Sequence, residues 1–525
     1  MLVWHTRPRV CGLAIDNRQS KVSGHDFSRA VAVRERRGFS PWWKHQEWLP
    51  RHCRGWVCGD GVGLLLLAAL LLISSASAET RPRYGGTLRV QLRVAPQSLD
   101  PAAAEQDAAF AQVAPLLFDT LVRLDTSGRP VPALATSWQQ ESEHRWRVTL
   151  RPGVRFSDGT GLASAVVAQS LHETNPDWNL RAVGDAVVIE SEQPLPNLPA
   201  VLALSRNSIV LRSEGKPLGT GPFRAADFQP GRRVTLAAQE DGWHERPFVD
   251  SVDIQLGRGT REQMVDLELG RADLVEVAPD QPARVVQAGR RVVTSDPVEL
   301  LALRFSHSNV RDARVRQALA LAIDRESIFN VLLQRHGEPA AGLLPNWMTG
   351  YSFLFPTTPQ VARARQLRTE ARLAAALTLV YDAGDPLSRL VAERIALNAA
   401  DAGITLKTLP STLNVTVPDI ELVRVRLASS DPGVALAELA RTDRLALSAL
   451  DSDGSPLSAA GVGADRVGIS DVYRATLASL HDFWAVPIAY LPAAYALSPR
   501  VRNWTRARDG SWSLSDVWLA AESRP

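Results

Sequence analysis

Side chains that could do chemistry are sparse in this 525-residue sequence, and none stands in a familiar catalytic or metal-binding pattern. There is no HExxH pair for zinc, no GxxxxGK loop for phosphates and no GxSxG turn for a nucleophilic serine. The histidines lack ligand spacing. Because Cys11, Cys53 and Cys58 all precede residue 79, the rest of the chain has no thiolate nucleophile or thiolate metal ligand. We expect no catalytic centre, no metal site and no cofactor.

A few aromatic and charged residues could instead hold a ligand. Trp243 stands in a loop between two strand-like segments, where an indole offers a broad apolar face and one donor. The alternative is a tryptophan that plugs the edge of the fold. Arg304, in LLALRFSHSN, could bind a carboxylate through two parallel hydrogen bonds from its guanidinium, or it could lie solvated at a strand edge. Asp431 precedes Pro432 in ASSDPG, a context typical of a turn former.

Hydrophobic periodicity indicates the elements that would position these residues. Residues 145–150, RWRVTL, alternate between polar and apolar side chains and predict a strand. Residues 151–153 have the composition of a tight turn, and residues 154–156 resume the alternation, so we expect a hairpin. We assign Trp138 and Trp146 to the hydrophobic core.

Two helices are predicted over residues 309–333. Asp324 fits the N-cap position of the second helix. The expected core-facing positions are Val315, Leu319 and Ala322 in the first helix, and Ile328, Val331 and Leu332 in the second.

Residues 377–409 predict a parallel crossover unit. A short apolar strand, 377–381, precedes an amphipathic helix, 387–402, and Gly403 stops this helix before a second strand, 404–409. The helix residues expected to face inward are Leu390, Ile395 and Leu397. Strand, helix and strand at this spacing indicate α/β architecture.

The first 78 residues differ from the rest of the chain. They hold eleven Lys or Arg and five Asp or Glu, a net charge of +6, whereas the remainder, with 48 basic and 51 acidic residues, has −3. Residues 62–73, VGLLLLAALLLI, have the length of a signal-peptide apolar core, and residues 76–78 match a signal-peptidase site. We expect export and cleavage after Ala78, with an initiation codon assigned too early. No cysteine follows the apolar run, so no lipid anchor is expected.

Several longer runs resemble one family. ALATSW and WRVTLRPGVRFSDG, a GGTLRV strand before an LDP loop, GTGP at residues 219–222, and RVRQALALAIDRESI are similar in kind and order to family 5 solute-binding proteins, which serve peptide, nickel and related ABC importers. The resemblance implies an α/β, periplasmic binding protein type II-like fold, with two lobes, hinge strands and an extra subdomain on the first lobe. The implied boundaries are 1–78 for the leader, 79–118 with 218–295 and 488–525 for lobe I, 119–217 for the extra subdomain and 296–487 for lobe II.

The resemblance also implies a function. The protein would capture a peptide or a related small solute between its lobes, in the periplasm, and deliver it to an ABC permease and its ATPase. Asp431 would pair with a ligand's α-ammonium, Trp243 would contact the ligand, and Trp347 and Tyr351 would line the cleft with Arg304. We expect a monomer that binds no nucleic acid and is not an enzyme.

Two alternatives remain open at this point. Residues 172–218 are shorter than is usual in the family, and Trp243 lacks the family's preceding asparagine-proline pair and tyrosine. Both departures favour a degenerate paralogue that reports its ligand to a signalling partner, which the absence of adjoining permease and ATPase genes would support. The other alternative is a hydrolase, which turnover by the purified protein would reveal.

Overall fold

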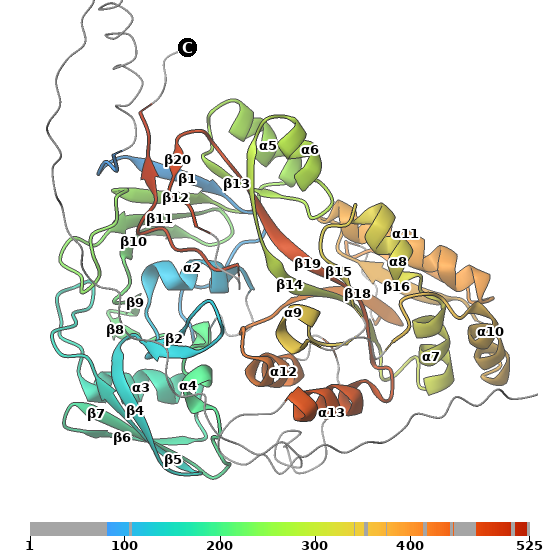
Figure 1. Ribbon diagram of the computed structural model, residues 1–525, viewed down its shortest axis with the longest axis horizontal. Helices are drawn as coiled ribbons and strands as arrows, with labels where there is room; N and C mark the ends of the chain where they lie inside the picture. The colour runs from blue at the N-terminus through green and yellow to red at the C-terminus, as the bar shows by residue number, and fades with distance from the viewer. Residues whose placement is uncertain are drawn as a thin grey trace, which may run out of the picture. The chain divides into compact units, whose positions relative to one another are not determined.

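The computed structural model describes residues 81–103, 108–340, 342–350, 355–373, 375–412, 417–441, 445, 469–505 and 510–521 (Figure 1). The leader, its apolar run and Tyr351 lie outside the described residues. All described residues belong to one compact unit. Among them, no helix combines the length and the apolar character needed to cross a membrane.

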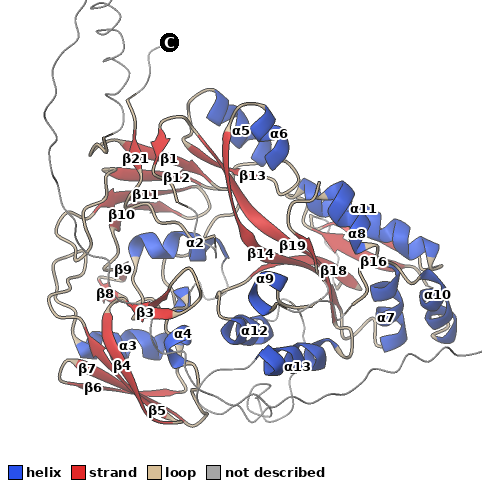
Figure 2. Ribbon diagram, viewed as in Figure 1, coloured by secondary structure: helices blue, strands red, loops and turns tan. Residues whose placement is uncertain are grey.

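The described residues form one large mixed sheet in which eleven strands take part (Figure 2). In spatial order, ten of them are β10 (Phe223–Gln229), β11 (Arg233–Ala238), β12 (Ser251–Gln255), β1 (Thr87–Gln91), β13 (Leu274–Val277), β19 (Ala485–Leu497), β14 (Arg291–Phe305), β18 (Ile420–Arg426), β16 (Leu377–Tyr381) and β17 (Leu406–Pro410). The eleventh strand, β15 (Glu338–Pro339), pairs with β19.

Each end of this sheet contains a parallel unit. β1 is parallel to both β12 and β13, and α5 (Thr260–Glu268) connects β12 with β13. β16 is parallel to β17, with α11 (Pro386–Asp401) between them in sequence. The crossover unit predicted over residues 377–409 is therefore confirmed, as is the core position of Ile395. We call the β10 to β13 end lobe I and the β18 to β17 end lobe II.

Two long antiparallel strands, β14 and β19, join the lobes and lie side by side along the sheet (Figure 1). β19 pairs with β13 through its last residues, whereas β14 pairs with β18 from Glu299 onward. The register between them breaks where Pro297 faces Pro492. Because proline lacks an amide donor, this point interrupts the ladder and forms a natural hinge between the lobes.

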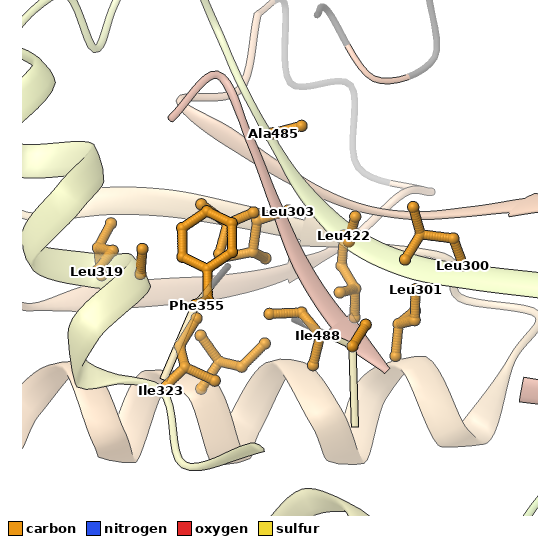
Figure 3. Packing of buried hydrophobic residues seen from close by; sticks show 14 of the residues in the cluster. Leu300, Leu301, Leu303, Leu319, Ile323, Phe355, Leu422, Ala485 and Ile488 are labelled. Carbon is orange, nitrogen blue, oxygen red and sulfur yellow. The ribbon is translucent and has the colours of Figure 1, made fainter. Parts of the chain in front are cut away.

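Separate hydrophobic clusters support the lobes. In lobe II, Leu300, Leu301 and Leu303 of β14 pack with Leu422 and with residues of the neighbouring helices (Figure 3). The lobe I cluster includes Leu88, Val90 and Leu274 from the parallel strands. Charged and polar side chains between these clusters therefore lie at the junction of the lobes rather than inside either core.

Helices and short strands complete the lobes. The lobe I helices are α2 (Ala108–Leu117) and α6 (Pro282–Gln287); those of lobe II are α7 (Ala313–Ala322), α8 (Arg325–Ser327) with a π turn (Ile328–Leu332), α9 (Asn346–Thr349), α10 (Val361–Glu370), α12 (Pro432–Arg441) and α13 (Ile469–Leu480). The short strands are β2 (Val122–Leu124), β3 (Pro130–Pro132), β8 (Leu211–Ser213), β9 (Lys216–Leu218), β20 (Val501–Arg502) and β21 (Trp518–Leu519).

A separate four-stranded sheet forms the subdomain attached to lobe I. Its strands, in spatial order, are β4 (Ala135–Ser142), β5 (Arg145–Leu150), β7 (Ala186–Ser191) and β6 (Trp178–Val183). They pack with α3 (Ser164–Thr174), α4 (Leu198–Val201) and the 3₁₀ turn Ser205–Asn207. Trp146 is buried in this cluster and Trp138 packs against it, which confirms their assignment to the core.

The hairpin predicted at residues 145–156 is wrong in its second half. β5 forms as expected, but it pairs with β4 and β7. Residues 152 and 153 make the turn, after which Val154 and Phe156 are buried with only an isolated bridge from Arg155 to Gly161. Their alternation reflects packing against the subdomain core and does not require strand pairing.

One predicted core position and one helix phase are also wrong. Asp324 caps α8 as expected, since its side chain accepts the amide hydrogen of Ser327. Val331, however, is 63% exposed. On α11, Leu390 and Leu397 are exposed, whereas Val391 and Ile395 are buried. Leu390 and Leu397 are two turns apart on one side of the helix, and Ile395 lies on the other, so the three cannot share one face.

Candidate functional site

A cavity of about 90 Å³ lies where the lobes meet. Residues that follow or end the parallel strands of both lobes contribute to it, which is where ligands commonly bind in α/β sheets. Lobe I provides residues near the ends of β1 and β13, and lobe II provides β18 and the start of α11. The charged residues lining this junction cavity are Arg93, Glu276, Glu299, Asp385, Arg424 and Arg426.

Arg424 of β18 is the centre of an ion-pair triad in the cavity wall. Its guanidinium donates to Oδ2 of Asp385 at 2.8 Å and to the carboxylate of Glu299. Asp385 also caps α11, because Oδ1 accepts the amide hydrogen of Leu387 at 3.2 Å. One carboxylate comes from the hinge strand β14 and the other from the N-cap of α11 in lobe II, so the triad holds residues from three elements together.

Electrostatics within the triad keeps its members charged. Burial is the largest single influence on Glu299 and Asp385 and acts to raise their pKa. The charge and hydrogen bond of Arg424, together with the weaker effects of other neighbouring groups, outweigh burial and hold the pKa of both groups below that of ordinary carboxyl groups. Burial likewise acts to lower the pKa of Arg424, and the two carboxylates raise it above the ordinary value. Loss of any member would leave a desolvated charge behind.

Glu276 of β13 is in a different electrostatic situation. Its Oε2 accepts the backbone amide hydrogen of Arg93 at 2.5 Å and lies 3.4 Å from Nε2 of Gln263. Within the described part of the chain, no cationic side chain forms an ion pair with it. Burial raises the pKa of Glu276, and the like charge of Glu299 adds to this effect, while the charge of Arg93 only partly opposes it.

Arg93 connects the two lobes at the cavity. It follows β1 in lobe I, and its Nη1 donates to Oδ2 of Asp382, which follows β16 in lobe II, at 3.1 Å. The aromatic contribution to the wall is Tyr495 of β19, whose hydroxyl accepts from Nε2 of Gln112 at 3.1 Å. Burial raises the pKa of this phenol, which therefore stays neutral.

The four described residues that sequence reasoning proposed for ligand binding do not line this cavity. Trp243 lies at the subdomain, where its indole nitrogen donates to Oδ2 of Asp119 at 3.0 Å, its ring packs against the subdomain core, and Arg151 sits 5.1 Å from its ring centroid. His244 contacts the same carboxylate of Asp119, at 2.9 Å.

Asp431 caps helix α12 and contacts lobe I. Oδ1 accepts the amide hydrogen of Val434 at 2.9 Å, and Oδ2 accepts from the side-chain amide of Asn197 at 3.0 Å. The turn-forming alternative therefore describes its geometry in this structure. Its pairing with a ligand's ammonium stays a prediction.

Arg304 and Trp347 are separated from one another. Arg304 forms an ion pair with Glu421 across β14 and β18, with both side chains about one-third exposed. The indole nitrogen of Trp347 on α9 donates to the carbonyl of Pro297, beside the hinge, at 2.8 Å. Tyr351 lies outside the described residues, so its predicted place in the cleft has no structural counterpart here.

Sequence reasoning missed the charged residues of the cavity. Glu276 stands in LVEV, Glu299 in VELLAL and Arg424 in LVRVRL, and in each case a charge interrupts an apolar strand. This local pattern is the same as that of a strand with one face in solvent, so it does not distinguish a cavity residue from a solvent-facing one. Glu276 and Arg424 stand on β13 and β18, which each have a parallel neighbour, and a charge on such a strand is the signal that could have found them.

The charged groups do not assemble into a metal site. Among the residues that the structure describes, no group of three or more His, Cys, Asp or Glu side chains is arranged to hold a metal ion. The cavity can instead enclose a small polar molecule, which would meet charges of both signs and the neutral phenol of Tyr495.

Comparison with family models gives one match over more than half of the chain. The model described as bacterial extracellular solute-binding proteins, family 5 middle, matches residues 129–421. This range contains the runs WRVTLRPGVRFSDG and RVRQALALAIDRESI of the sequence resemblance.

Curated relatives are similar at low identity. A nickel-binding protein, NikA, of Staphylococcus aureus is 22% identical over 241 residues, which are 42% of this chain and 49% of the relative. A glutathione-binding protein, GsiB, of Pectobacterium atrosepticum is 27% identical over 304 residues, which are 52% of this chain and 59% of the relative. The alignments thus span about half of these relatives' lengths.

Solved structures agree over most of the chain. The oligopeptide-binding protein AppA from Bacillus subtilis, in complex with a nonapeptide, has a TM-score of 0.72 at 18% identity and covers 84% of this chain and 100% of its own. NikA from Staphylococcus aureus, in complex with nickel and L-histidine, has a TM-score of 0.71 at 18% identity and covers 82% of this chain and 99% of its own. The predicted α/β fold with two lobes, similar to type II periplasmic binding proteins, is confirmed.

Proposed function

Because this chain belongs to family 5 of the bacterial extracellular solute-binding proteins, we propose that it is the periplasmic substrate-binding component of an ABC importer. It captures a peptide or another small solute between its lobes and delivers it to a membrane permease driven by an ATPase. The relatives compared above are named for the ligands they bind and not for a reaction, which supports binding rather than catalysis.

The observation that carries this proposal is the junction cavity. Its wall takes residues from both lobes, and it lies beside the proline-interrupted point of β14 and β19. A solute that touches both walls binds the closed arrangement better than an open one, so it shifts the population toward closure. The permease can then distinguish loaded from empty protein by lobe arrangement.

Export to the periplasm rests on the leader, which lies outside the described residues. The apolar run at 62–73 and the small residues at 76–78 support a cleaved signal peptide. A soluble receptor of this kind works as a monomer that diffuses between solute and permease.

The proposal is tested by native mass spectrometry of the full chain purified from its own periplasm. We expect one small solute bound per chain and lost on partial unfolding. The unfolded and refolded protein is then titrated calorimetrically with a peptide library and with fractions of the same extract. Absence of a bound solute, together with no heat from either source, would contradict the transport function.

A ligand sensor is the second candidate. It is favoured by the engagement of Asp431, the residue expected to anchor a peptide ammonium, in a contact with Asn197 of the opposite lobe and in a helix cap. Genes for a permease and an ATPase beside this one would support transport, whereas a signalling gene in their place would support the sensor.

A further inference from the structure

Among the described residues, Glu276 is the carboxylate of the junction cavity that forms no ion pair. Arg424 is matched by Glu299 and Asp385, and Arg93 is matched by Asp382. Both hydrogen bonds to Glu276 end on the same oxygen, Oε2, and come from neutral donors, a backbone amide and the side chain of Gln263. In the described residues, Oε1 has neither a hydrogen-bond donor nor a cation as partner.

The surroundings of Glu276 keep its carboxylate in place. Gln263 of α5 accepts the amide hydrogen of Glu276 at 2.8 Å while its own amide faces the carboxylate. The register of β13 with β19 sets Glu276 opposite Tyr495, another residue of the cavity wall. The group is therefore fixed before any ligand arrives, which reduces the ordering cost of binding.

We propose that the solute carries a positively charged nitrogen, of the ammonium or guanidinium class, and that Glu276 is the residue that binds this group. The inference rests on the proposed function and adds the charge of the solute to it. A cation on Oε1 would form a charge-assisted hydrogen bond with this partly exposed carboxylate and would give it the ion-pair partner that it lacks among the described residues. A neutral or anionic group at this position would leave the carboxylate desolvated and uncompensated.

The size of the cavity limits the class further. At about 90 Å³ it is smaller than the 300 to 1,000 Å³ that is usual for drug-sized ligands. The charged nitrogen can belong to the amino terminus of a short peptide or to a free amine. These two sources share one chemistry at Glu276, and the probes below separate them.

The test measures calorimetric affinity of the full chain for two probes, L-alanyl-L-alanine and putrescine, and for their N-acetylated forms. Glu276→Gln keeps the size of the side chain and its hydrogen bond from the amide of Arg93, but removes the charge. The matched control is Glu393→Gln on α11, an exposed carboxylate paired with Arg389 outside the cavity. Glu276→Asp keeps the charge on a shorter side chain, and circular dichroism verifies folding of each variant.

We expect the wild type and Glu393→Gln to bind at least one free amine and to reject its acetylated form. Glu276→Gln should weaken that amine about 10- to 100-fold, the loss of one charged hydrogen bond, and Glu276→Asp should recover part of it. Binding of the dipeptide alone identifies a peptide amino terminus, and binding of putrescine identifies a free amine.

Three outcomes would overturn the inference: equal affinity for free and acetylated probes, unchanged affinity in Glu276→Gln, or no binding of either amine by the wild type. If native mass spectrometry then finds a neutral or anionic solute, the proposed function stands and only the charge assignment fails. If it finds no solute at all, the proposed function fails as well.

Discussion

At the scale of single residues, the junction cavity contains carboxylates in two different electrostatic environments. Glu299 and Asp385 keep a lowered pKa because Arg424, together with other neighbouring groups, outweighs the effect of burial. Glu276 lies on β13, which β19 separates from β14. Burial raises the pKa of Glu276, and the hydrogen bond and charge of Arg93 only partly oppose this effect. The same side-chain chemistry therefore stabilises the wall in one place and leaves an unmatched charge in another.

This contrast predicts how stability depends on pH without ligand. A carboxyl whose pKa is raised on folding holds its proton more tightly in the folded state, so stability falls as pH rises from the unfolded pKa, near 4.3, through the folded one. The charged or titratable groups facing Glu276 are Arg93 beyond β1, Glu299 on β14 and Tyr495 on β19, and α5 presents the neutral Gln263.

Glu276→Gln should therefore become more stable relative to the wild type as pH rises through that window. A difference of one pH unit between folded and unfolded pKa corresponds to about 1.4 kcal/mol. Urea unfolding of both proteins from pH 4 to pH 8 measures this difference. A constant gap between the two curves would show that Glu276 ionises in the folded protein as it does in the unfolded chain.

The positions of the cavity residues in the chain explain why the site could not be located from sequence. Arg93, Glu276, Glu299 and Arg424 lie on four separate strands or loops, and each looks locally like a solvated position. Their proximity depends on the order of the strands in the sheet, which involves pairings far apart in the chain. Trp243 was predicted to contact the ligand because it stands in a loop, but its indole nitrogen donates a hydrogen bond to Asp119 at the subdomain.

At the scale of elements, local periodicity predicted secondary structure correctly where a short stretch of sequence determines it. The unit β16, α11 and β17 was predicted to within about two residues at each boundary, because its alternation and its stop at Gly403 are contained in a short stretch. The face of α11 was not predicted, since Leu390 and Leu397 are apolar yet exposed. The face of a helix that is buried depends on how the helix packs on the sheet, which its own sequence does not determine alone.

The cap of α12 gives a prediction for Asp431. Asparagine can also accept the amide hydrogen of Val434, whereas alanine cannot. Asp431→Ala should therefore lose about 1 kcal/mol of stability and Asp431→Asn much less, as measured by thermal unfolding. If Asp431 instead anchors a peptide ammonium, Asp431→Asn would strongly weaken binding of a free-amine dipeptide and leave binding of its N-acetyl form unaffected. Equal affinity of wild type and variant for the free-amine dipeptide would exclude the anchor role.

The triad of β18, β14 and α11 gives a second prediction at this scale. Arg424→Met removes the cation that donates to both Glu299 and Asp385, which should cost about 3 to 5 kcal/mol at neutral pH. The cost should shrink as pH falls, because the stranded carboxylates can then take up protons. Denaturant unfolding at pH 7 and pH 4.5 tests both statements, with Arg389→Met, an exposed pair on α11, as a control that should change little. An equal loss at both pH values would argue against charge as the cause.

At the scale of the whole molecule, the lobes touch at a second place away from the junction cavity. Arg206, in the 3₁₀ turn Ser205–Asn207 of the subdomain, pairs with Glu438 of α12 at 3.1 Å, and each side chain is only 11% exposed. Apolar residues flank this pair, with Ala200 and Leu204 against Val434. Asn197 adds its hydrogen bond to Asp431. We call this set of contacts the α4–α12 contact.

The α4–α12 contact bears on closure because its two sides belong to different lobes. Any opening about the hinge at Pro297 and Pro492 separates one pair of walls at the cavity and another at this contact. The free energy of the contact therefore adds to that of the ligand in favouring the closed arrangement. Glu438 also pairs with Arg441 at 2.9 Å, so it keeps a counter-charge when Arg206 is removed.

Weakening this contact should open the molecule and lower ligand affinity together. In Arg206→Ala, the closed population falls, and the apparent dissociation constant rises in proportion, because affinity scales with the fraction of binding-competent protein. Small-angle X-ray scattering of the ligand-free chain should give a larger radius of gyration than the wild type, and a saturating solute should restore the wild-type value. Arg181→Ala removes an exposed pair with Glu190 inside the subdomain sheet and should change neither quantity. Affinity reduced without any change in scattering would mean that Arg206 acts on the subdomain alone and not on closure.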